Sequence, residues 1–311
     1  MKSPRLLLCL AAVTAVCVSV QAQTPAPKRS VAHRGASSYA PEHTAAAYTL
    51  AVSQGADYVE QDLAVTKDGA LICLHDESLE RTTDVETRFP DRVSTDAQGR
   101  TRWLAADLTL AEIKTLDAGS WFDAKFAGER ILTFDEAIDL IGMGAGLYPE
   151  LKTPALYRGR NVDIVALFAD AVKRRGLAMK MPDGRARLVV QSFDEQAVRD
   201  LAKALPQVPR TFLIGGGAPV ERWLSGPAAL KEMATFATDL GPAKGLVEKT
   251  PAIVQWAHAA GLTVTPYTFR SGATGTHKDV EAEMRHFLYT LGVDALFTDN
   301  PDKFPKTSAI R

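Results

Sequence analysis

Cysteine is scarce in this sequence, and neither sign of charge is in excess. The 311 residues include three cysteines, 36 lysines and arginines, and 37 aspartates and glutamates, so the formal net charge is −1. Without a basic excess or an arginine-rich run, we expect no nucleic-acid partner. Glycine (22) and proline (17) are too few for a collagen-like or low-complexity chain. The composition is that of an ordinary globular protein.

Sequence motifs of several common enzyme sites are also missing. No G-x-G-x-x-G opens a helix, no phosphate-binding P-loop is present, and no His-x-His occurs. The first two absences argue against a nucleotide-binding sheet. The third argues against the metal-dependent amidohydrolase barrels. Function must therefore be sought among other polar residues.

Long hydrophobic runs are absent except at the N-terminus. Lys2 and Arg5 precede an apolar run over 6–20, and small residues follow at the positions that a signal peptidase reads. We therefore predict a signal peptide over 1–22 and a linker over 23–29. The run is too short for a transmembrane helix. We expect an exported, periplasmic protein with no stable membrane insertion.

The cysteines provide no disulfide framework. Cys9 and Cys17 fall within the predicted signal peptide, which leaves Cys73 alone. A single cysteine forms neither an internal disulfide nor a cysteine zinc site, and in an apolar run it is expected in the core. Lipid attachment at Cys17 is disfavoured, because Thr14 stands where a leucine is expected.

Short apolar runs alternate with helical patterns over residues 30–311. The alternation indicates parallel strands with crossover helices. About eight strands in this length favour an α/β fold of the (β/α)8 TIM-barrel type over an open doubly wound sheet. Expected strands are Ser30–His33, Tyr58–Val65, Ala70–His75, Gly146–Lys152, Arg187–Ser192, Arg210–Ile214, Thr263–Tyr267 and Asp294–Thr298. Expected helices are Thr44–Gln54, Thr133–Ile141, Val162–Arg175, Asp194–Ala204, Ala228–Met233, Pro251–Ala260 and Val280–Leu291.

One segment interrupts the alternation. Residues from about 82 to 130 are polar and rich in turn-forming residues, with one short helical pattern near Thr109–Leu116. We predict a small subdomain inserted into a loop of the barrel rather than a second hydrophobic core.

Polar residues gather at the C-terminal ends of the expected strands, where a TIM barrel places its active site. Glu60 and Asp62 are two residues apart in one strand, so both face the same side of the sheet. If that side is the barrel interior, Glu150 converges with them. Three buried anions without a counter-charge are prohibitive, and an oxygen-only set favours a bound Ca²⁺ or Mg²⁺ over zinc.

Two of the six histidines stand out. His33 ends the first expected strand and is followed by Arg34 and Gly35, whereas His75 is followed directly by Asp76. Histidine exchanges protons near neutral pH, which suits acid–base catalysis. The histidines in later helices and loops are expected to be structural.

Taken in order, these motifs resemble the glycerophosphodiester phosphodiesterase family. The similarity covers residues 30–304 and rests on His33-Arg34-Gly35-Ala36, Pro41-Glu42-His43-Thr44, Glu60-Gln61-Asp62, His75-Asp76, Glu150-Leu151-Lys152 and Leu296–Asp302. Many family members have Asn where this chain has His43. The His43 variant, the Phe89-Pro90-Asp91-Arg92 insertion and the segment Pro266–Ser271 resemble the exported, periplasmic bacterial branch.

The resemblance implies a metal-dependent hydrolase that cleaves small-molecule glycerophosphodiesters to glycerol 3-phosphate and an alcohol. It implies metal binding by Glu60, Asp62 and Glu150, acid–base catalysis by His33 and His75, and phosphate binding by Arg34 and Lys152. Ca²⁺ is the first expectation for the metal and Mg²⁺ the second. A cation with two basic side chains stabilises the charge that develops on the phosphate.

Several alternatives remain open from the residues. The sequence does not assign the acid and the base between the two histidines, nor does it distinguish direct attack by water from attack by a glycerol hydroxyl. A phospholipase D-like or phosphoinositide phospholipase C-like enzyme would use a similar barrel on intact lipid. A non-catalytic glycerophosphodiester-binding protein would not require both histidines. We expect strict recognition of glycerol and tolerance of the alcohol.

Overall fold

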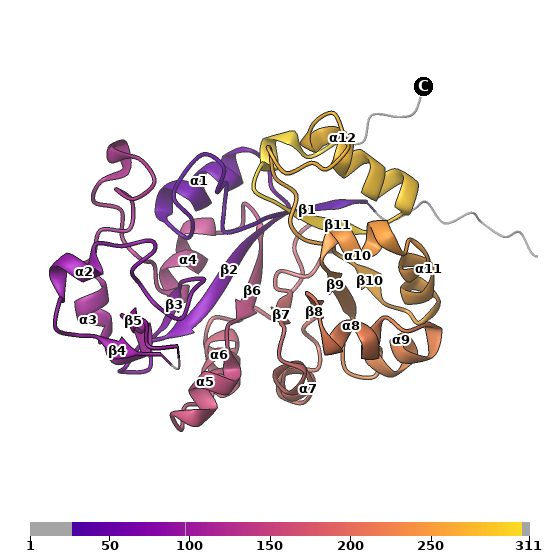
Figure 1. Ribbon diagram of the computed structural model, residues 1–311. Coiled ribbons are helices and arrows are strands. Elements are labelled where there is room, and N and C mark those ends of the chain that lie inside the picture. Colours follow the sequence, from indigo (N-terminus) through magenta and orange to yellow (C-terminus); the bar gives the residue numbers. More distant parts are fainter. Residues whose placement is uncertain (1–26, 97, 307–311) are drawn as a thin grey trace, which may run out of the picture.

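The computed structural model describes residues 27–96 and 98–306 (Figure 1). The predicted signal peptide, with Cys9 and Cys17, and the first part of the predicted linker lie outside the described residues. Among the residues that are described, no helix is both long enough and apolar enough to cross a membrane.

Within these residues, eight parallel strands form a nearly closed barrel in the order β10-β9-β8-β7-β6-β2-β1-β11. Backbone hydrogen bonds from Asp294 N to Val264 O (2.9 Å) and from Phe297 N to Pro266 O (3.0 Å) join its two ends. The expected TIM barrel is confirmed. Its strands are β1 (Arg29–Ala32), β2 (Tyr58–Val65), β6 (Gly146–Leu151), β7 (Val190–Ser192), β8 (Arg210–Ile214), β9 (Asp239–Pro242), β10 (Thr263–Val264) and β11 (Ala295–Thr298).

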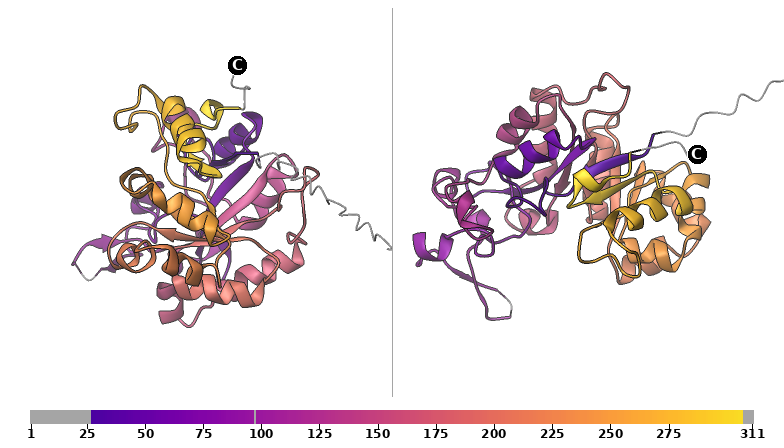
Figure 2. Two further views of the ribbon diagram at one scale, coloured as in Figure 1. Left: turned by 90° about the vertical axis from the view of Figure 1, so that its right-hand side faces the viewer. Right: turned by 90° about the horizontal axis from the view of Figure 1, so that it is seen from above.

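Helices surround the strands (Figures 1 and 2). The helix α4 shows why they form: Thr133 and Glu136 make a capping box at its start, and Phe134, Ile138 and Ile141 bury one face. The outer helices are α1 (Ala45–Ser53), α4 (Phe134–Ile141), α5 (Pro154–Gly159), α6 (Ile164–Arg174), α7 (Glu195–Ala204), α8 (Ala218–Trp223), α9 (Pro227–Met233), α10 (Lys244–Lys249), α11 (Ala252–Ala259) and α12 (Val280–Arg285). A π-helix over His286–Leu291 continues α12, so the helix expected over Val280–Leu291 is not α-helical throughout.

The prediction of which segments form the eight barrel strands was wrong in two places. The apolar run expected as a barrel strand at Ala70–His75 contains β3 (Leu71–Cys73), which pairs antiparallel with the C-terminal half of β2. The eighth parallel strand is instead β9, Asp239-Leu240-Gly241-Pro242, for which no strand was expected. With one large apolar side chain among four residues, β9 has no apolar run to reveal it.

The segment 82–130 packs beside β2 and β3 and shares their core. Buried Val85, Leu108, Ile113 and Leu116 belong to the same apolar cluster as Leu63 of β2. Figure 1 shows this segment on the side of the barrel opposite α8–α11. Its elements are α2 (Val85–Arg88), β4 (Ser94–Thr95), β5 (Thr101–Arg102), α3 (Leu110–Ile113) and 3₁₀ turns at Ala105–Asp107 and Ala124–Phe126.

Candidate active site

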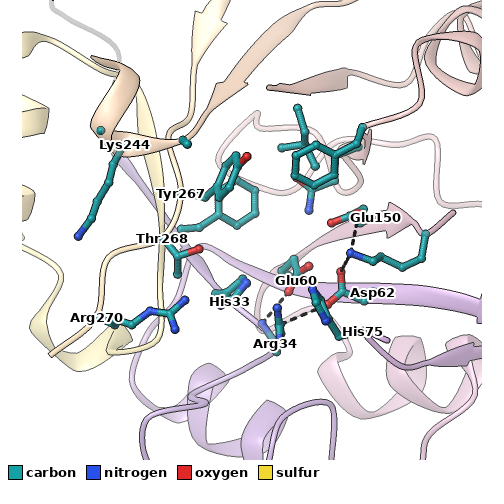
Figure 3. A pocket seen from close by; sticks show the side chains of 17 residues that line it. His33, Arg34, Glu60, Asp62, His75, Glu150, Lys244, Tyr267, Thr268 and Arg270 are labelled. Carbon is teal, nitrogen blue, oxygen red and sulfur yellow. Dashed lines mark hydrogen bonds and ion pairs between the residues drawn. The ribbon is translucent and has the colours of Figure 1, made fainter. Parts of the chain in front are cut away.

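A pocket of about 410 Å³ opens at the C-terminal ends of the barrel strands (Figure 3). All seven side chains that the sequence singled out line this pocket. They are His33, Arg34, Glu60, Asp62, His75, Glu150 and Lys152. Residues up to 119 positions apart along the chain are therefore brought to one place, as expected for a TIM barrel.

The alternation of side chains along the strands places the carboxylates in the pocket. Glu60 and Asp62 of β2 face the barrel interior, and Glu150 of β6 is paired in register with Asp62. Gln61 and Leu63, between and beyond them, do not line the pocket. The two-residue spacing thus places the acidic groups on one wall.

His75 reaches the pocket by a different route from the one expected. Instead of ending a parallel barrel strand, it follows β3, which folds back along β2. Leu74 N donates a hydrogen bond to Asp62 O at 2.8 Å, so the hairpin returns the chain to the level of the carboxylates. The hairpin, and not a barrel strand, positions His75.

The turn after β1 brings His33 and Arg34 close to helix α1. Arg34 adopts a left-handed backbone conformation (φ 56°), and its N–H donates to Glu60 Oε2 at 2.6 Å. Gly35 follows with φ +89°, and a Cβ there would lie 2.8 Å from the backbone of Ala47. Such backbone conformations persist where the surrounding structure holds them in place.

Two basic side chains neutralise part of the acidic wall. Lys152 Nζ lies 2.9 Å from Glu150 Oε1 and 3.7 Å from Asp62 Oδ1, and Arg34 Nε lies 3.3 Å from Asp62 Oδ2. Burial alone would raise the pKa of Asp62, but Lys152, His43 and Arg34 hold it well below its usual range. The expectation that the three carboxylates lack counter-charges is therefore wrong for Asp62 and Glu150.

Of the three carboxylates of this wall, Glu60 is the one without a salt bridge among the described residues. Its side chain is 1% exposed, and burial, with the Asp62 charge next, raises its pKa well above the ordinary value. Burial and the charge of Asp62 likewise raise the pKa of Glu150 to about 8. Anions crowded in this way favour a bound cation.

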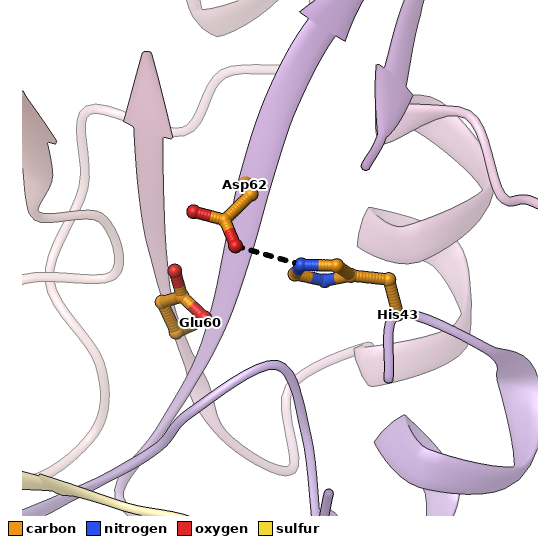
Figure 4. A group of neighbouring side chains, drawn as sticks. All are labelled: His43, Glu60 and Asp62. Atoms are coloured by element: carbon orange, nitrogen blue, oxygen red, sulfur yellow. Dashed lines mark hydrogen bonds and ion pairs between the residues drawn. The ribbon is translucent and has the colours of Figure 1, made fainter. Parts of the chain in front are cut away.

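His43 completes a group that could hold a metal ion (Figure 4). Ligand atoms of His43, Glu60 and Asp62 lie within 4.8 Å of one another, and His43 Nε2 is 2.9 Å from Asp62 Oδ2. His43 Nδ1 lies 2.8 Å from Tyr48 Oη, which fixes the ring as metal-bound histidines usually are fixed. The donors fit a divalent cation. The sequence carried the signal in Pro41-Glu42-His43-Thr44, but no role was assigned to His43.

Each pocket histidine is held through Nδ1 by an aspartate. Asp76 is the neighbour that singled out His75 in the sequence, whereas Asp299, in the motif Leu296–Asp302, was given no role. His33 Nδ1 lies 2.7 Å from Asp299 Oδ1, and His75 Nδ1 lies 2.6 Å from Asp76 Oδ1. The bond to His75 lowers the pKa of Asp76, and the bond to His33 lowers that of Asp299 against the effect of burial. Because both aspartates are ionised acceptors, Nδ1 carries the proton and Nε2 is left for a ligand.

Asp76, Arg81 and Glu42 form a continuous chain of hydrogen bonds and ion pairs from His75 to Arg34. Arg81 Nε donates to Asp76 Oδ2 (2.5 Å), and its terminal nitrogens donate to both Glu42 oxygens (2.6 and 3.1 Å). Glu42 in turn accepts from Arg34 Nη1 at 3.1 and 3.2 Å. Burial alone would raise the pKa of Glu42, but Arg81 and Arg34 lower it to about 2. A pocket histidine and a pocket arginine are thus fixed relative to one another.

The rest of the pocket lining is mainly uncharged. It includes Gln191 of β7, which is paired in register with Glu150, and Phe193, whose ring centroid lies 5.9 Å from Lys152 Nζ. Leu213 of β8 and Tyr267 also belong to this part of the lining. Lys244 also borders the pocket, but Figure 3 shows its side chain directed away, where Nζ donates to Glu283 Oε1 (2.5 Å) and Ala273 O (2.7 Å). From the sequence, Phe193 and Tyr267 could equally line the mouth of the site or pack in the core, and the structure places both in the pocket lining.

Comparison with known proteins agrees with the geometry. The sequence profile of the Glycerophosphoryl diester phosphodiesterase family matches residues 33–303. A glycerophosphodiester phosphodiesterase of Bacillus subtilis is 34% identical over 305 residues, which cover 94% of this chain and 92% of that protein. A protein of the same name from Haemophilus influenzae is 30% identical over 97% of both chains.

Solved structures show the same similarity in three dimensions. A glycerophosphodiester phosphodiesterase of Agrobacterium tumefaciens superposes with a TM-score of 0.65 at 29% identity and covers 89% of this chain and 98% of its own. A phosphodiesterase of Oleispira antarctica, solved with the product sn-glycerol-3-phosphate, gives 0.66 at 28% identity and covers 89% and 95%. This chain is therefore an enzyme that belongs to the glycerophosphoryl diester phosphodiesterase family.

Proposed function

We propose that this enzyme hydrolyses glycerophosphodiesters to glycerol 3-phosphate and an alcohol, with water supplying the hydroxyl and proton. The observation that carries the proposal is the pocket that brings two aspartate-held histidines together with Arg34, Lys152 and three buried carboxylates. The product seen in the Oleispira relative matches this chemistry.

The basic side chains and the histidines have different roles in the proposed reaction. Arg34 and Lys152 supply positive charge for the phosphate oxygens, while each stays paired with acidic neighbours that fix its position. Because Nδ1 of His33 and of His75 is bonded to an aspartate, Nε2 of each ring is left for the substrate. One histidine accepts the proton of the attacking hydroxyl, and the other donates a proton to the leaving alcohol. Asp299 and Asp76 stabilise whichever ring is protonated.

We further propose that Glu60, Asp62 and Glu150 hold a divalent cation, with His43 next to it. A hard cation accepts oxygen donors, and Ca²⁺, with its larger and more flexible shell, suits side chains from different strands better than Mg²⁺. When bound, the ion would polarise the phosphate and neutralise the charge of Glu60. The raised pKa of Glu60, caused first by burial and then by Asp62, supports an ion at this place.

We also propose that the protein is exported to the periplasm. Residues 1–22 have the charged start, apolar run and small residues of a signal peptide, and the resemblance to the periplasmic branch agrees with export. Lipid phosphodiesterases of the phospholipase D-like or phosphoinositide phospholipase C-like type are less well supported, because the matched relatives are glycerophosphodiester phosphodiesterases over nearly their whole length.

The test is hydrolysis of glycerophosphocholine with and without a chelator, with glycerol 3-phosphate and choline both quantified. We expect equal amounts of the two products, loss of turnover after chelation, and recovery with Ca²⁺. Glu60→Gln should weaken metal binding, measured by calorimetry, while the thermal transition of the protein remains cooperative. Release of phosphocholine instead of choline would overturn the proposed cleavage, and full activity in metal-free protein would overturn the metal.

A further inference from the structure

Gln191 is a buried polar residue whose hydrogen bonding is incomplete within the protein. It lies in β7, lines the pocket and is 2% exposed. Its Oε1 has no hydrogen-bond partner among the described residues. Because buried acceptors are rarely left unpaired, an acceptor of this kind in a ligand pocket indicates that a ligand supplies the donor.

The surroundings of Gln191 favour an uncharged, hydroxyl-bearing ligand group. Phe193, Leu213 and Tyr267 line the pocket with it, and the ring centroids of Phe193 and Tyr267 lie 5.7 Å apart in an edge-to-face arrangement. Gln191 is paired in register with Glu150, and Lys152 Nζ lies 5.9 Å from the Phe193 ring centroid. An anionic phosphodiester group has no proton to donate to Oε1, so the donor must be a hydroxyl group on one of the two arms of the substrate.

Depth in the pocket distinguishes the two arms of the substrate. Gln191 is nearly inaccessible, whereas Phe193, two residues further along the chain, is 45% exposed. A group at the bottom of a pocket is enclosed and must be the same in every substrate, while a group near the mouth can vary. The arm common to all glycerophosphodiesters is glycerol.

We propose that Gln191 binds a glycerol hydroxyl and thereby selects the glycerol arm of the substrate, an inference that rests on the proposed function. The hydroxyl donates to Oε1 and can accept from Nε2, so one amide satisfies it completely. A diester without that hydroxyl leaves Oε1 unpaired and loses this interaction. Gln191 is therefore a specificity-determining residue, and the proton transfers remain with the histidines.

The test uses two diesters with the same leaving group: glycerophosphocholine and the propyl diester of phosphocholine, which lacks both free glycerol hydroxyls. Wild-type enzyme should prefer the first. Gln191→Met, close in size but without hydrogen-bonding atoms, should reduce kcat/KM for glycerophosphocholine on the order of 10-fold or more and leave the propyl diester within about 3-fold. Gln191→Asn, which withdraws the amide, should show the same loss of preference.

Gln54→Met is the matched control. Gln54 Oε1 is also buried without a partner, but it follows α1 and does not line the pocket. This variant should keep the wild-type preference. Equilibrium binding of glycerol 3-phosphate and propyl phosphate, measured by calorimetry, provides a readout without turnover: Gln191→Met should weaken binding of the first and not of the second.

The outcomes separate this inference from the proposed function. If wild-type enzyme cleaves neither diester, the proposed function fails. If it prefers glycerophosphocholine and both Gln191 variants retain that preference, the function stands and the role of Gln191 is wrong. A loss of Ca²⁺ affinity in Gln191→Met that accounts for the lost activity would assign the amide to the cation instead and also overturn the inference.

Discussion

His33 and His75 share a hydrogen-bonding pattern but stand in different surroundings. Behind His33 is Asp299, whose second oxygen lies 3.4 Å from Arg270 Nε, and behind His75 is Asp76 with Arg81. His33 is the more enclosed of the two, with a side chain 14% exposed against 32% for His75. Burial, with the Arg34 charge next, lowers the pKa of His33 and favours its neutral form. This asymmetry suits a base and an acid.

Replacing either histidine tests the pair. His33→Ala and His75→Ala should each lower kcat/KM on glycerophosphocholine on the order of 10²-fold or more. The variant that lacks the acid should recover on a glycerophosphodiester with a nitrophenol leaving group, because that group leaves without protonation. His258→Ala is the control, since His258 pairs with Asp294 outside the pocket. An unchanged kcat/KM in either variant would make that histidine structural.

Arg81 is predicted to position His75 and Arg34, because it contacts Asp76 and Glu42 and does not line the pocket. Arg81→Gln should release both His75 and Arg34 and lower kcat/KM on the order of 10-fold, with an increase in KM as phosphate binding loosens. Arg81→Lys should restore little, since one ammonium cannot span two carboxylates. Arg88→Gln, in a surface pair with Asp84, is the control. Unchanged kcat and KM in Arg81→Gln would show that the chain of ion pairs has no role in the site.

At the scale of elements, local pattern predicted the barrel better than its individual strands. Periodicity in β2 and β6 revealed both the strands and the inward direction of Glu60 and Glu150. It could not reveal β9, whose pairing with β8 and β10 is decided by the closure of the barrel. Nor could it tell that β3 folds back on β2, because an apolar run of three residues is the same in either direction.

Some residues of the candidate site could be predicted from the sequence and others could not. Residues with a chemical motif in the sequence were found, and the structure gathers them in one pocket. Asp299 and Arg81, which fix those residues, were not assigned. Asp299 lies 266 positions from His33, and Arg81 lies 39 positions from Glu42, the carboxylate that links it to Arg34. Gln191 lies near the end of an expected strand but was assigned no role, since an unpaired buried oxygen is visible only after folding.

The close packing of the turn after β1 can be tested by comparing two glycines. Gly35 and Gly69 have nearly the same positive φ (+89° and +85°), but a Cβ at Gly35 meets Ala47 at 2.8 Å while one at Gly69 meets nothing within 4 Å. Gly69→Ala should therefore cost only the conformational term, about 1–2 kcal/mol of the free energy of unfolding. Gly35→Ala should cost clearly more and displace His33 and Arg34, which lowers kcat/KM. Urea unfolding measures both, and equal costs would contradict the close contact.

The barrel as a whole is filled differently at its two ends. The pocket occupies the C-terminal end, whereas aromatic and apolar side chains fill the interior below it: Val31, Tyr58, Tyr148, Val189 and Phe297. In the same interior, Asp239 of β9 accepts hydrogen bonds from Thr265 Oγ1 (3.0 Å), Thr263 Oγ1 (2.5 Å) and Tyr148 Oη (3.3 Å). A carboxyl group is thus enclosed in the barrel without a salt bridge among the described residues.

Asp239 makes the stability of the whole molecule depend on pH. Burial raises its pKa from 3.8 to about 6, so between these values the folded protein holds a proton that the unfolded chain releases. The free energy of unfolding should therefore fall as pH rises through this window, by up to about 3 kcal/mol at about 1.4 kcal/mol per pKa unit. Asp239→Asn removes this group from the titration.

The measurement is urea unfolding of both proteins from pH 4 to pH 7. Because the other groups titrate alike in the two proteins, the unfolding free energy of Asp239→Asn minus that of wild type isolates this carboxyl. The difference should rise steadily from pH 4 to pH 6 and level off above it, whatever its value at pH 4. Asp170→Asn, at an exposed position of α6, should give a nearly constant difference. A constant difference for Asp239→Asn as well would mean that the three hydroxyl groups stabilise its charge inside the barrel as well as water does.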